Sequence, residues 1–398
     1  MKNTGEEKRA ATISAEEEES FSTLQIGLGC FSEEAGGLNR FYCDLLQYLP
    51  RIGVEVQGLV VGTPGVVCAS GRQLDAFSPA SASLLSRLRE ARRAVRHALA
   101  KDRFPLVVSH FALYTFPALD LIPPRPMVIH FHGPWALEGN TEGGRGLNTR
   151  AKAALERAVY RRGNRFIVLS EAFRDILHRD YGVPLERVRV VAGGVNVGRF
   201  ATKTTRREAR ERLGWRQDRP TILAVRRLAQ RMGLKDLIEA MDKVRVSVPD
   251  AQLLVAGTGP LAKALNAHVR ALGLEDSVRF LGFVSDEDLT LAYRAADLTV
   301  VPTVALEGFG LVAVESLAAG TPVLVTPVGG LPEVVRELSP DLVLPTTGAD
   351  SLAEGLAASL EGELVLPSAQ SCQAYARERF DWPVVASRVR GVYTEAIR

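Results

Sequence analysis

The chain has 398 residues, of which 46% are hydrophobic and 24% charged, which is an ordinary composition for a globular protein. This length predicts two domains rather than one. The formal net charge of +3 is too small to indicate nucleic-acid binding, and neither zinc-ligand spacing nor interleaved basic and aromatic residues support it. Composition and charge therefore exclude a nucleic acid as the expected partner.

The four cysteines are scattered without a Cys-x-x-Cys pair, which argues against a disulfide framework or a metal cluster and favours a reducing compartment. Residues 1–20 are polar, with an acidic block at 16–19 and no apolar core of a signal peptide, so we expect a disordered leader there. No run of eighteen apolar residues predicts a membrane span. We therefore expect a cytoplasmic protein.

Strand and helix patterns alternate along the chain, which predicts parallel sheets with helices on both faces. In the first half, a strand at 24–30 is followed by a loop at 31–37 and a helix to about residue 49. Gly36 and Gly37, at the end of that loop, allow a close backbone approach to a ligand at the helix N-terminus. The later strands of this half are expected at 54–61, 106–110, 127–131, 166–170 and 188–191.

A strongly basic segment, 87–99, has apolar residues at helical spacing. We interpret it as a solvated helix that covers the sheet. Contact with an anionic lipid surface, at the inner face of a membrane, is the alternative interpretation.

Histidines gather at strand ends in this half. His130 and His132 lie on one side of the end of the strand at 127–131, where an imidazole can hydrogen-bond a substrate hydroxyl near neutral pH. A histidine at such a place is often a core residue, so His132 is the main candidate, and His130 and His110 are weaker ones. Trp135 is either a platform for a ligand or a cover for the strand end.

The second half restarts after a charged stretch at 203–219, with strands expected at 221–225, 252–256, 278–283, 298–301, 323–326 and 342–344. Two doubly wound halves in tandem, joined near 200–206, are the simplest architecture, and a ligand would bind in the cleft between them. We expect residues 21–200 and 201–382 to form an N-terminal and a C-terminal Rossmann-like domain. The tail predicts helices that break at 380–383.

Two segments of the second half imitate other sites. Gly257 and Gly259 follow a strand as in a dinucleotide fingerprint, but that strand is the second of its half and a proline stands where the helix should begin. A nicotinamide cofactor is therefore not expected, and a phosphate or base contact is. The acidic run that begins at Asp286 is interpreted as a helix start capped by Ser285 rather than as a metal site.

Two carboxylates, Glu307 and Glu315, stand eight positions apart, with Gly-Phe-Gly-Leu at 308–311 between them. The two glycines let the backbone approach a ligand closely, and amides at the start of the following helix form a ready anion site. A carboxylate binds vicinal hydroxyls well because it accepts two hydrogen bonds. The segment is therefore suited to sugar hydroxyls and a diphosphate.

This Glu-Gly-Phe-Gly sequence and its second glutamate, followed by Ala-Ala-Gly-Thr-Pro-Val and Gly-Gly-Leu-Pro-Glu-Val, resemble the signature of retaining glycosyltransferases of the GT-B fold, family four (glycosyl transferases group 1). The similarity covers nearly the whole chain past residue 20. It implies two Rossmann-like domains that face each other across a cleft, with the last helix, about 383–398, packed on the N-terminal domain. It also implies metal-independent sugar transfer from a nucleotide diphosphate sugar to an acceptor hydroxyl, with retention and without a cofactor.

The resemblance also implies roles for single residues. Glu315 would hold the ribose diol, Glu307 would lie near the transferred sugar, and His132 would line the reaction centre. A family arginine that clamps the departing diphosphate falls on Arg227. The usual family lysine position is occupied by Met232 in this chain, so Arg231 is expected to supply the second cation, with Lys235 in reserve.

Further substrate contacts that the resemblance implies come from loops and strand ends: Gly36, Gly37, Gly257, Gly259, Phe283, Val284, Gly308, Phe309, Gly310, Leu311 and Glu315. A UDP-sugar donor is slightly preferred over a GDP-sugar donor, and the acceptor is a small molecule, a glycan or a lipid-linked molecule. One alternative function is a GT-B-like nucleotide-sugar epimerase, which would need more acids in the N-terminal half. Another is a non-catalytic sugar-nucleotide binding protein, which the pair of acids disfavours.

Overall fold

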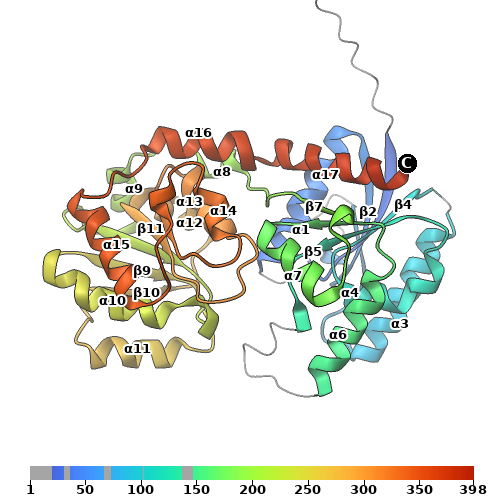
Figure 1. Ribbon diagram of the computed structural model, residues 1–398, viewed down its shortest axis with the longest axis horizontal. Helices are drawn as coiled ribbons and strands as arrows, with labels where there is room; N and C mark the ends of the chain where they lie inside the picture. The colour runs from blue at the N-terminus through green and yellow to red at the C-terminus, as the bar shows by residue number, and fades with distance from the viewer. Residues whose placement is uncertain (1–19, 31–35, 67–72, 102, 137–146) are drawn as a thin grey trace, which may run out of the picture.

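The computed structural model describes residues 20–30, 36–66, 73–101, 103–136 and 147–398. All of the predicted leader except Ser20 lies outside the described residues, as do parts of the loops expected at 31–37 and after Trp135. Two lobes lie side by side, and each is built on its own sheet (Figure 1). We call them the N-terminal lobe and the C-terminal lobe.

The N-terminal lobe contains a seven-stranded parallel sheet with the order β3-β2-β1-β4-β5-β6-β7. Every residue of β4 and β5 is buried, as expected of a sheet covered on both faces. The strands are β1 (Phe21–Ile26), β2 (Val54–Val61), β3 (Leu74–Ser78), β4 (Leu106–Ser109), β5 (Met127–Phe131), β6 (Arg165–Val168) and β7 (Val188–Val190). The helices are α1 (Gly37–Tyr48), α3 (Leu84–Leu99), α4 (Ala112–Thr115), α6 (Leu147–Tyr160) and α7 (Glu171–Tyr181).

The C-terminal lobe contains a five-stranded parallel sheet with the order β10-β9-β8-β11-β12. Its strands are β8 (Thr221–Val225), β9 (Gln252–Ala256), β10 (Val278–Gly282), β11 (Leu298–Val301) and β12 (Val323–Val325). Its helices are α9 (Arg206–Leu213), α10 (Leu234–Ser247), α11 (Ala262–Ala271), α12 (Asp286–Ala295), α13 (Leu311–Ala318), α14 (Leu331–Val335) and α15 (Ala349–Glu361). The short helix α8 (Val197–Phe200) also packs into the core of this lobe.

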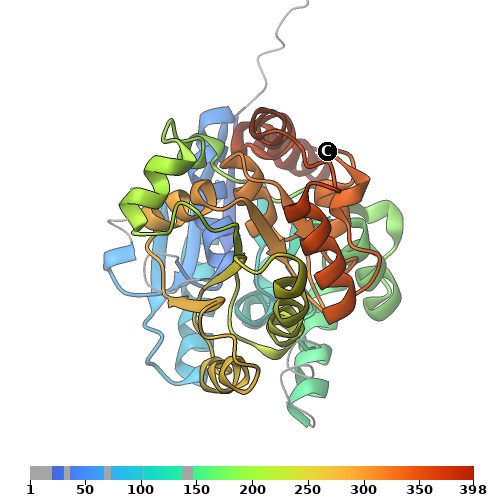
Figure 2. The ribbon, with the colours of Figure 1, turned by 90° about the vertical axis from the view of Figure 1, so that its left-hand side faces the viewer.

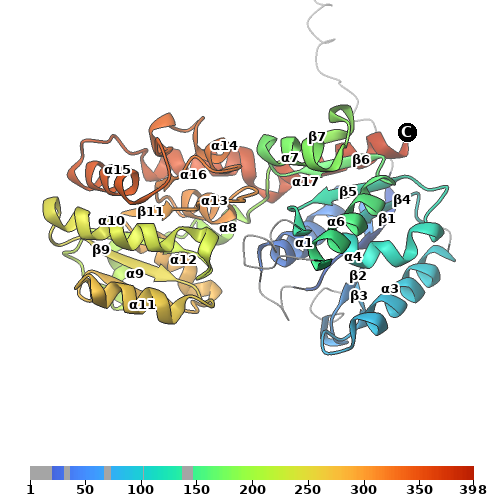
Figure 3. The same cartoon turned by 60° about the horizontal axis from the view of Figure 1, so that its bottom comes forward.

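The last two helices link the lobes. Helix α16 (Ala369–Phe380) lies along the C-terminal lobe, and α17 (Trp382–Ile397) lies along the N-terminal lobe (Figures 1 and 3). The break between them is the one expected at 380–383, where the Asp381 carboxylate accepts a hydrogen bond from the Trp382 amide at 3.1 Å. Trp382 and Val385 of α17 are buried with residues of α1 on one face of the first sheet.

The strand pattern of the sequence is largely confirmed, with two exceptions. The edge strand β3 was not predicted, because its sequence, Leu-Asp-Ala-Phe-Ser, has no β-branched residue and one charge. The strand expected at 342–344 is wrong: a 3-10 turn at Pro340–Leu342 is followed by a single bridge between Val343 and Val325. Pro340 in that turn and Pro345 directly after the segment have no amide hydrogen to donate, so the pairing does not extend into a strand. Among the described helices, none has the length and apolarity needed to cross a membrane.

The order of strands in each sheet reverses at one place. This switch point lies between β1 and β4 in the first sheet and between β8 and β11 in the second. Ligands of such sheets bind outside the carboxyl ends of the strands at the switch point. Viewed end-on, one lobe lies in front of the other (Figure 2). The fold therefore favours a ligand site at the loops after β8 and β11.

Candidate functional site

A largely buried ion pair spans the switch point of the C-terminal lobe. Arg226 directly follows β8, and Glu307 lies in the loop after β11. The Arg226 guanidinium donates through Nη2 to Thr303 Oγ1 and to Glu307 Oε2, and Thr303 Oγ1 donates to the same Oε2 at 3.3 Å. The two charged side chains are only 7% and 13% exposed. The first of the two predicted acids is thus fixed at the edge of the sheet where ligands bind.

The charge of Glu307 follows from its surroundings. Burial raises the pKa of this carboxyl, but the charge and hydrogen bond of Arg226, the charge of Arg231 and the Thr303 hydroxyl lower it by more. The resulting pKa lies below the ordinary value of a glutamic acid. Glu307 is therefore ionised at neutral pH.

The backbone next to Glu307 is strained. Leu306 has a φ of 52°, and among the described residues it is the one non-glycine residue with a positive φ. This left-handed conformation is energetically unfavourable for a residue with a bulky side chain, and residues strained in this way cluster at functional sites. Arg231, in the 3-10 turn η4 (Gln230–Met232), donates from Nη1 to the Leu306 carbonyl at 2.9 Å. Arg231 thus holds the turn that presents Glu307.

The second acid, Glu315, lies in the second turn of α13 and is 6% exposed. The Tyr293 hydroxyl of α12 donates to its Oε2 at 2.9 Å. Burial raises the pKa of Glu315 above its ordinary value, because the opposing effects of Arg40, the Tyr293 hydrogen bond and Arg199 are smaller. The two acids therefore differ: the surroundings of Glu307 favour its ionised form, whereas those of Glu315 disfavour it.

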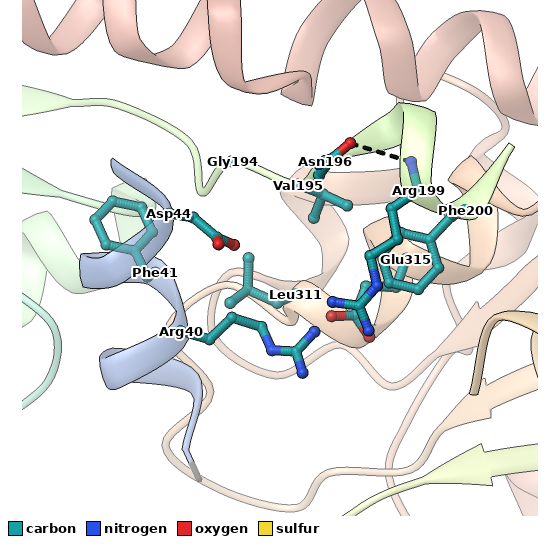
Figure 4. A pocket seen from close by; sticks show the side chains of 10 residues that line it. All are labelled: Arg40, Phe41, Asp44, Gly194, Val195, Asn196, Arg199, Phe200, Leu311 and Glu315. Atoms are coloured by element: carbon teal, nitrogen blue, oxygen red, sulfur yellow. Dashed lines mark hydrogen bonds between the residues drawn. The ribbon is translucent and has the colours of Figure 1, made fainter. Parts of the chain in front are cut away.

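Glu315 forms part of a pocket between the lobes (Figure 4). Arg40 of α1, from the left of the view, and Arg199 of α8, from above, both extend toward its carboxylate. The pocket is lined by residues of α1, of the chain that connects the lobes, of α8 and of α13: Arg40, Phe41, Asp44, Gly194, Val195, Asn196, Arg199, Phe200, Leu311 and Glu315. Its walls thus combine both lobes, two cations and two acids, Asp44 and Glu315, which suits a polar, charged ligand.

The predicted helix cap at the start of α12 is confirmed. The Ser285 hydroxyl accepts a hydrogen bond from the Asp288 amide at 3.1 Å. Asp286 has a second role that the sequence did not indicate. Its carboxylate binds Arg40 at 2.5 Å and Arg199 at 2.8 Å, so it ties the N-terminal lobe to the C-terminal lobe beside the pocket.

The structure places the predicted cations at different depths. Arg227 is exposed at the end of β8, and Arg231 is half-buried against the Leu306 turn. Met232 is buried and supplies no charge, and Lys235 pairs with Glu239 at 3.4 Å along α10. Sequence reasoning missed Arg226 altogether. Two adjacent arginines at a strand end face opposite sides, so one of them had to point inward, but only the fold shows which.

Gly257 and Gly259 lie directly against the arginine segment. A Cβ on Gly257 would come within 2.0 Å of the Arg226 carbonyl oxygen, and one on Gly259 within 2.5 Å of the Leu228 carbonyl oxygen. These glycines therefore allow the loop after β9 to support the loop after β8. A direct ligand contact by the two glycines remains a prediction.

At the neighbouring strand end, Phe283 is 78% exposed while Val284 packs on the core. An exposed aromatic ring next to the carboxyl edge of a sheet is available for stacking on a base. The predicted nucleobase contact at Phe283 and Val284 therefore lies on an accessible surface.

The segment 308–311 connects the acids. A Cβ on Gly308 would lie 2.6 Å from the Phe173 ring of α7, so this glycine allows the lobes to approach closely. Gly310, with a φ of 90°, precedes Leu311, the first residue of α13. The Phe309 side chain is buried against Phe380, with ring centroids 5.7 Å apart, so that only its backbone can face a ligand.

Gly36 and Gly37 occupy the start of α1, one turn before Arg40 of the pocket. A Cβ at either glycine would meet no atom within 4 Å. The open space around them is compatible with the predicted approach of a ligand to this helix N-terminus. The loop before them, 31–35, lies outside the described residues.

Three histidines cluster at the carboxyl ends of β4 and β5. His110 Nδ1 and His132 Nε2 are 3.2 Å apart, and His110 Nε2 lies 2.9 Å from the Gln25 side-chain oxygen. His130 Nε2 is 2.8 Å from the Tyr393 hydroxyl of α17. The His132 ring also contacts Phe41, a residue of the pocket, with centroids 5.2 Å apart. His132 is therefore the histidine nearest the cleft, and His110 and His130 are core residues behind it.

These histidines could in principle hold a metal ion, since their ring nitrogens lie within 4.8 Å of one another. However, the facing nitrogens of His110 and His132 already share a hydrogen bond. The ring of His130 stacks on His110, with centroids 4.2 Å apart and an angle of 18°. A metal must lie in the plane of each ligating ring, and stacked rings have separate planes. The arrangement is therefore that of a hydrogen-bonded cluster of neutral imidazoles.

We expect this cluster to make the protein sensitive to acid. Burial lowers the pKa of His132 to about 4, against 6.5 for an ordinary histidine, and lowers those of His110 and His130 as well. Between these two pKa values the unfolded chain binds more protons than the folded one. The neutral histidines therefore contribute to the unfolding free energy in full above pH 6.5, and this contribution is lost as pH falls through about 4.

Urea unfolding between pH 4 and 7 measures this effect. His132→Gln should make the decrease of the unfolding free energy with falling pH shallower, while His97→Gln, on the exposed side of α3, should leave it as in the wild type. An identical pH slope for His132→Gln and the wild type would contradict the assignment.

Trp135 lies beyond the histidines, in contact with Phe111, with ring centroids 5.4 Å apart. The Lys152 ammonium lies 4.4 Å from the centroid of its indole ring. Its backbone amide donates to the buried Glu156 carboxylate at 3.1 Å. Trp135 therefore covers the strand ends of the N-terminal lobe, and its use as an acceptor platform remains a prediction.

Comparison with known families gives two matches that adjoin along the chain. Residues 35–199 match the family Glycosyltransferase Family 4, and residues 205–379 match the family Glycosyl transferases group 1. Together they include the histidines of the first lobe and both acids of the second.

Individual proteins agree with this. The D-inositol 3-phosphate glycosyltransferase of Streptomyces bingchenggensis is 31% identical over 92% of this chain and 86% of that protein. An uncharacterized glycosyltransferase of Methanocaldococcus jannaschii is 32% identical over 58% of this chain, and the chain spans 60% of that relative's length. Among solved structures, Anabaena HepE in complex with UDP and glucose superposes with a TM-score of 0.77 at 20% identity, covering 94% of this chain and 100% of the other.

Proposed function

The chain belongs to the group 1 glycosyltransferases, and from this premise we propose that it transfers a glycosyl unit from a nucleotide diphosphate sugar to an acceptor hydroxyl. Its two lobes with parallel sheets form the GT-B fold, which its structural neighbours share. The observation that carries the proposal is the juxtaposition of Glu307, Glu315 and the arginine segment 226–231 at one switch point, beside a pocket between the lobes.

The proposed donor site uses the charges of this switch point. Glu315 accepts hydrogen bonds from the ribose diol, and Glu307 faces the transferred sugar. Arg227 and Arg231 neutralise the diphosphate, which gains negative charge as it departs. A UDP-sugar is the proposed donor, in keeping with the structural similarity to a protein solved with UDP and glucose. No cofactor is part of the proposal.

In the proposed reaction, the bond between the anomeric carbon and the diphosphate oxygen breaks, and a bond from the acceptor oxygen to that carbon forms on the same face. The acceptor's proton passes to the departing phosphate oxygen. Retention and independence of a metal ion follow from the resemblance to the family rather than from the geometry. Apposition of the lobes, as through Asp286, would exclude water that otherwise hydrolyses the donor.

The acceptor is proposed to approach from the N-terminal lobe, past His132 and Trp135. A lipid-linked acceptor is one of its proposed classes, and α3 offers a surface for it. Leu84 and Leu85 are 47% and 67% exposed at the start of this helix, ahead of the exposed Arg89 and Arg93. Sedimentation with vesicles tests this contact: binding to anionic but not to zwitterionic lipid supports it, and equal absence of binding contradicts it.

Product analysis tests the proposed reaction. The full chain, with EDTA present, is incubated with each of several UDP- and GDP-sugars and a mixture of polyol, glycan and lipid acceptors. We expect mass spectrometry to detect an acceptor enlarged by one sugar, and NMR to show the donor's anomeric configuration in the product. An isomerised nucleotide sugar without transfer would identify an epimerase instead. Donor that is bound but never consumed would identify a non-catalytic binding protein.

A further inference from the structure

We propose that Arg226 is a positioning residue of the active site, which fixes the orientation and the negative charge of the Glu307 carboxylate in the cleft. This inference rests on the proposed function, because it requires Glu307 to act on the bound sugar. It goes beyond the donor site described above, in which the cations that bind the diphosphate are Arg227 and Arg231.

The first support is the direction of the contacts. Arg226 and Thr303 both bind Oε2 of Glu307. The other carboxylate oxygen, Oε1, takes part in neither of these bonds. A carboxylate held through one oxygen by two partners from two different strand ends cannot rotate freely. Arg226 thus presents Oε1 of Glu307 in one direction.

The second support is that stability alone does not explain a buried arginine here. Arg226 is 8% exposed, and its Nε atom has no hydrogen-bond partner among the described residues. Taking a guanidinium out of water costs free energy that an ion pair often does no more than offset. An apolar side chain at the end of β8 would avoid that cost. The charge is therefore better explained by the work that Glu307 must do.

The third support is electrostatic. The charged groups that face Glu307 are Arg226 from the end of β8 and Arg231 from η4, while the loop after β11 contributes the neutral Thr303. The loop before α14 meets the backbone of Glu307, with a hydrogen bond from the Gly330 amide to the Glu307 carbonyl at 3.0 Å. Burial raises the pKa of Glu307, and Arg226 is the largest influence that lowers it. Without Arg226 the pKa of Glu307 must rise.

The proposed reaction requires the Glu307 carboxylate to be both ionised and correctly oriented. An ionised carboxylate accepts hydrogen bonds from sugar hydroxyls and stabilises positive charge that develops at the anomeric carbon, whereas a protonated carboxyl does neither well. A correctly aimed group loses much of its effect when it is displaced by as little as about 1 Å. Arg226 would therefore affect the turnover of bound donor more than its affinity.

The test is the pH dependence of kcat for Arg226→Met and Arg226→Lys in the full chain, with the donor identified by product analysis. For Arg226→Met we expect kcat at neutral pH to fall roughly hundredfold, with a change in donor KM within about threefold. Its acidic limb should move to higher pH, because a less acidic Glu307 is protonated sooner. Arg226→Lys keeps a cation, so its acidic limb should stay near that of the wild type and part of kcat should return.

Arg210→Met is the matched control. Arg210 is also a buried arginine, and it binds the Asp297 carboxylate at 2.6 Å, away from the cleft on α9. This variant should lose stability, as any broken buried pair does, but keep the wild-type pH profile of kcat. If Arg226→Met does not fold, Arg226→Gln carries the same test, since it keeps a hydrogen-bond donor without the charge.

The outcomes separate the two proposals. An active wild type together with a folded Arg226→Met that keeps the wild-type acidic limb and kcat would overturn the role of Arg226 alone. A wild type that transfers sugar from no donor would defeat the proposed function, and this inference with it.

Discussion

Glutamine in place of Glu307 is expected to lower kcat about a thousandfold, which corresponds to about 4 kcal/mol of lost transition-state stabilisation. The substitution keeps the size of the side chain and an oxygen for Thr303 and Arg226. In the proposed reaction it removes the negative charge that faces the sugar, where positive charge develops as the diphosphate leaves. The change should therefore appear in turnover measured at saturating donor, by release of the nucleoside diphosphate.

The same substitution leaves the Arg226 guanidinium without its counter-charge, so we also expect the unfolding free energy to fall by about 3 kcal/mol. A double variant, Glu307→Gln with Arg226→Met, has no unpaired buried charge. It should regain most of that stability and none of the activity. Activities are compared per folded molecule, by circular dichroism at the assay temperature.

Glu395→Gln is the matched control for Glu307→Gln. Glu395 of α17 binds Arg165 at 2.9 Å on the N-terminal lobe, remote from the pocket. Its loss should leave kcat within about twofold of the wild type, as is usual for changes outside the reacting centre. If Glu307→Gln retained as much activity as this control, Glu307 would not act in the reaction.

Glutamine in place of Glu315 is expected to weaken donor binding about a hundredfold while it stabilises the protein. Two hydrogen bonds from a ribose diol to a charged acceptor contribute about 3 kcal/mol, and a neutral amide loses most of that. The affinity for the donor is measured by calorimetry. Glu287→Gln, on the exposed face of α12, is the control that should leave the affinity unchanged.

The stabilising effect of Glu315→Gln follows from the raised pKa of Glu315. A carboxyl whose folded pKa is raised contributes stability that is complete below its unfolded value of 4.5 and is lost as pH rises through the folded pKa. At pH 7.5 the buried anion is therefore a cost, and glutamine, which can still accept the Tyr293 hydrogen bond, removes it. We expect the melting temperature to rise by about 2 °C at pH 7.5. The gain should vanish below pH 4.5; a gain that grows at low pH would contradict this reasoning.

Much of the fold follows from the sequence because parallel strands buried on both faces leave continuous apolar runs. The runs at β4, β5 and β11 predicted strands at the right places, and the break between α16 and α17 was visible as an Asp-Trp-Pro sequence. The edge strand β3 left no such signal. The 342–344 segment gave a false one, because a short apolar run does not show how far its pairing with a neighbouring strand extends, and here it is limited to one bridge.

The residues of the site also divide into those that the sequence indicates and those that only the fold reveals. Glu307 and Glu315 could be found because glycines and helix spacing surround them in sequence. The inward direction of Arg226 and the bridge from Asp286 to Arg40 could not, since each depends on residues more than fifty positions away. Contacts of this kind, within a lobe or between lobes, are set by tertiary packing, and no local pattern in a single sequence indicates them.

Calorimetric titration of the full chain with UDP-, GDP- and ADP-sugars tests the central claim most directly, because every role assigned to the cleft requires an activated sugar to bind there. We predict measurable binding heat with at least one of these donors, and a markedly weaker affinity for the same donor in Glu315→Gln than in Glu287→Gln. Absence of heat with every donor, or equal affinity in the two variants, would contradict the account.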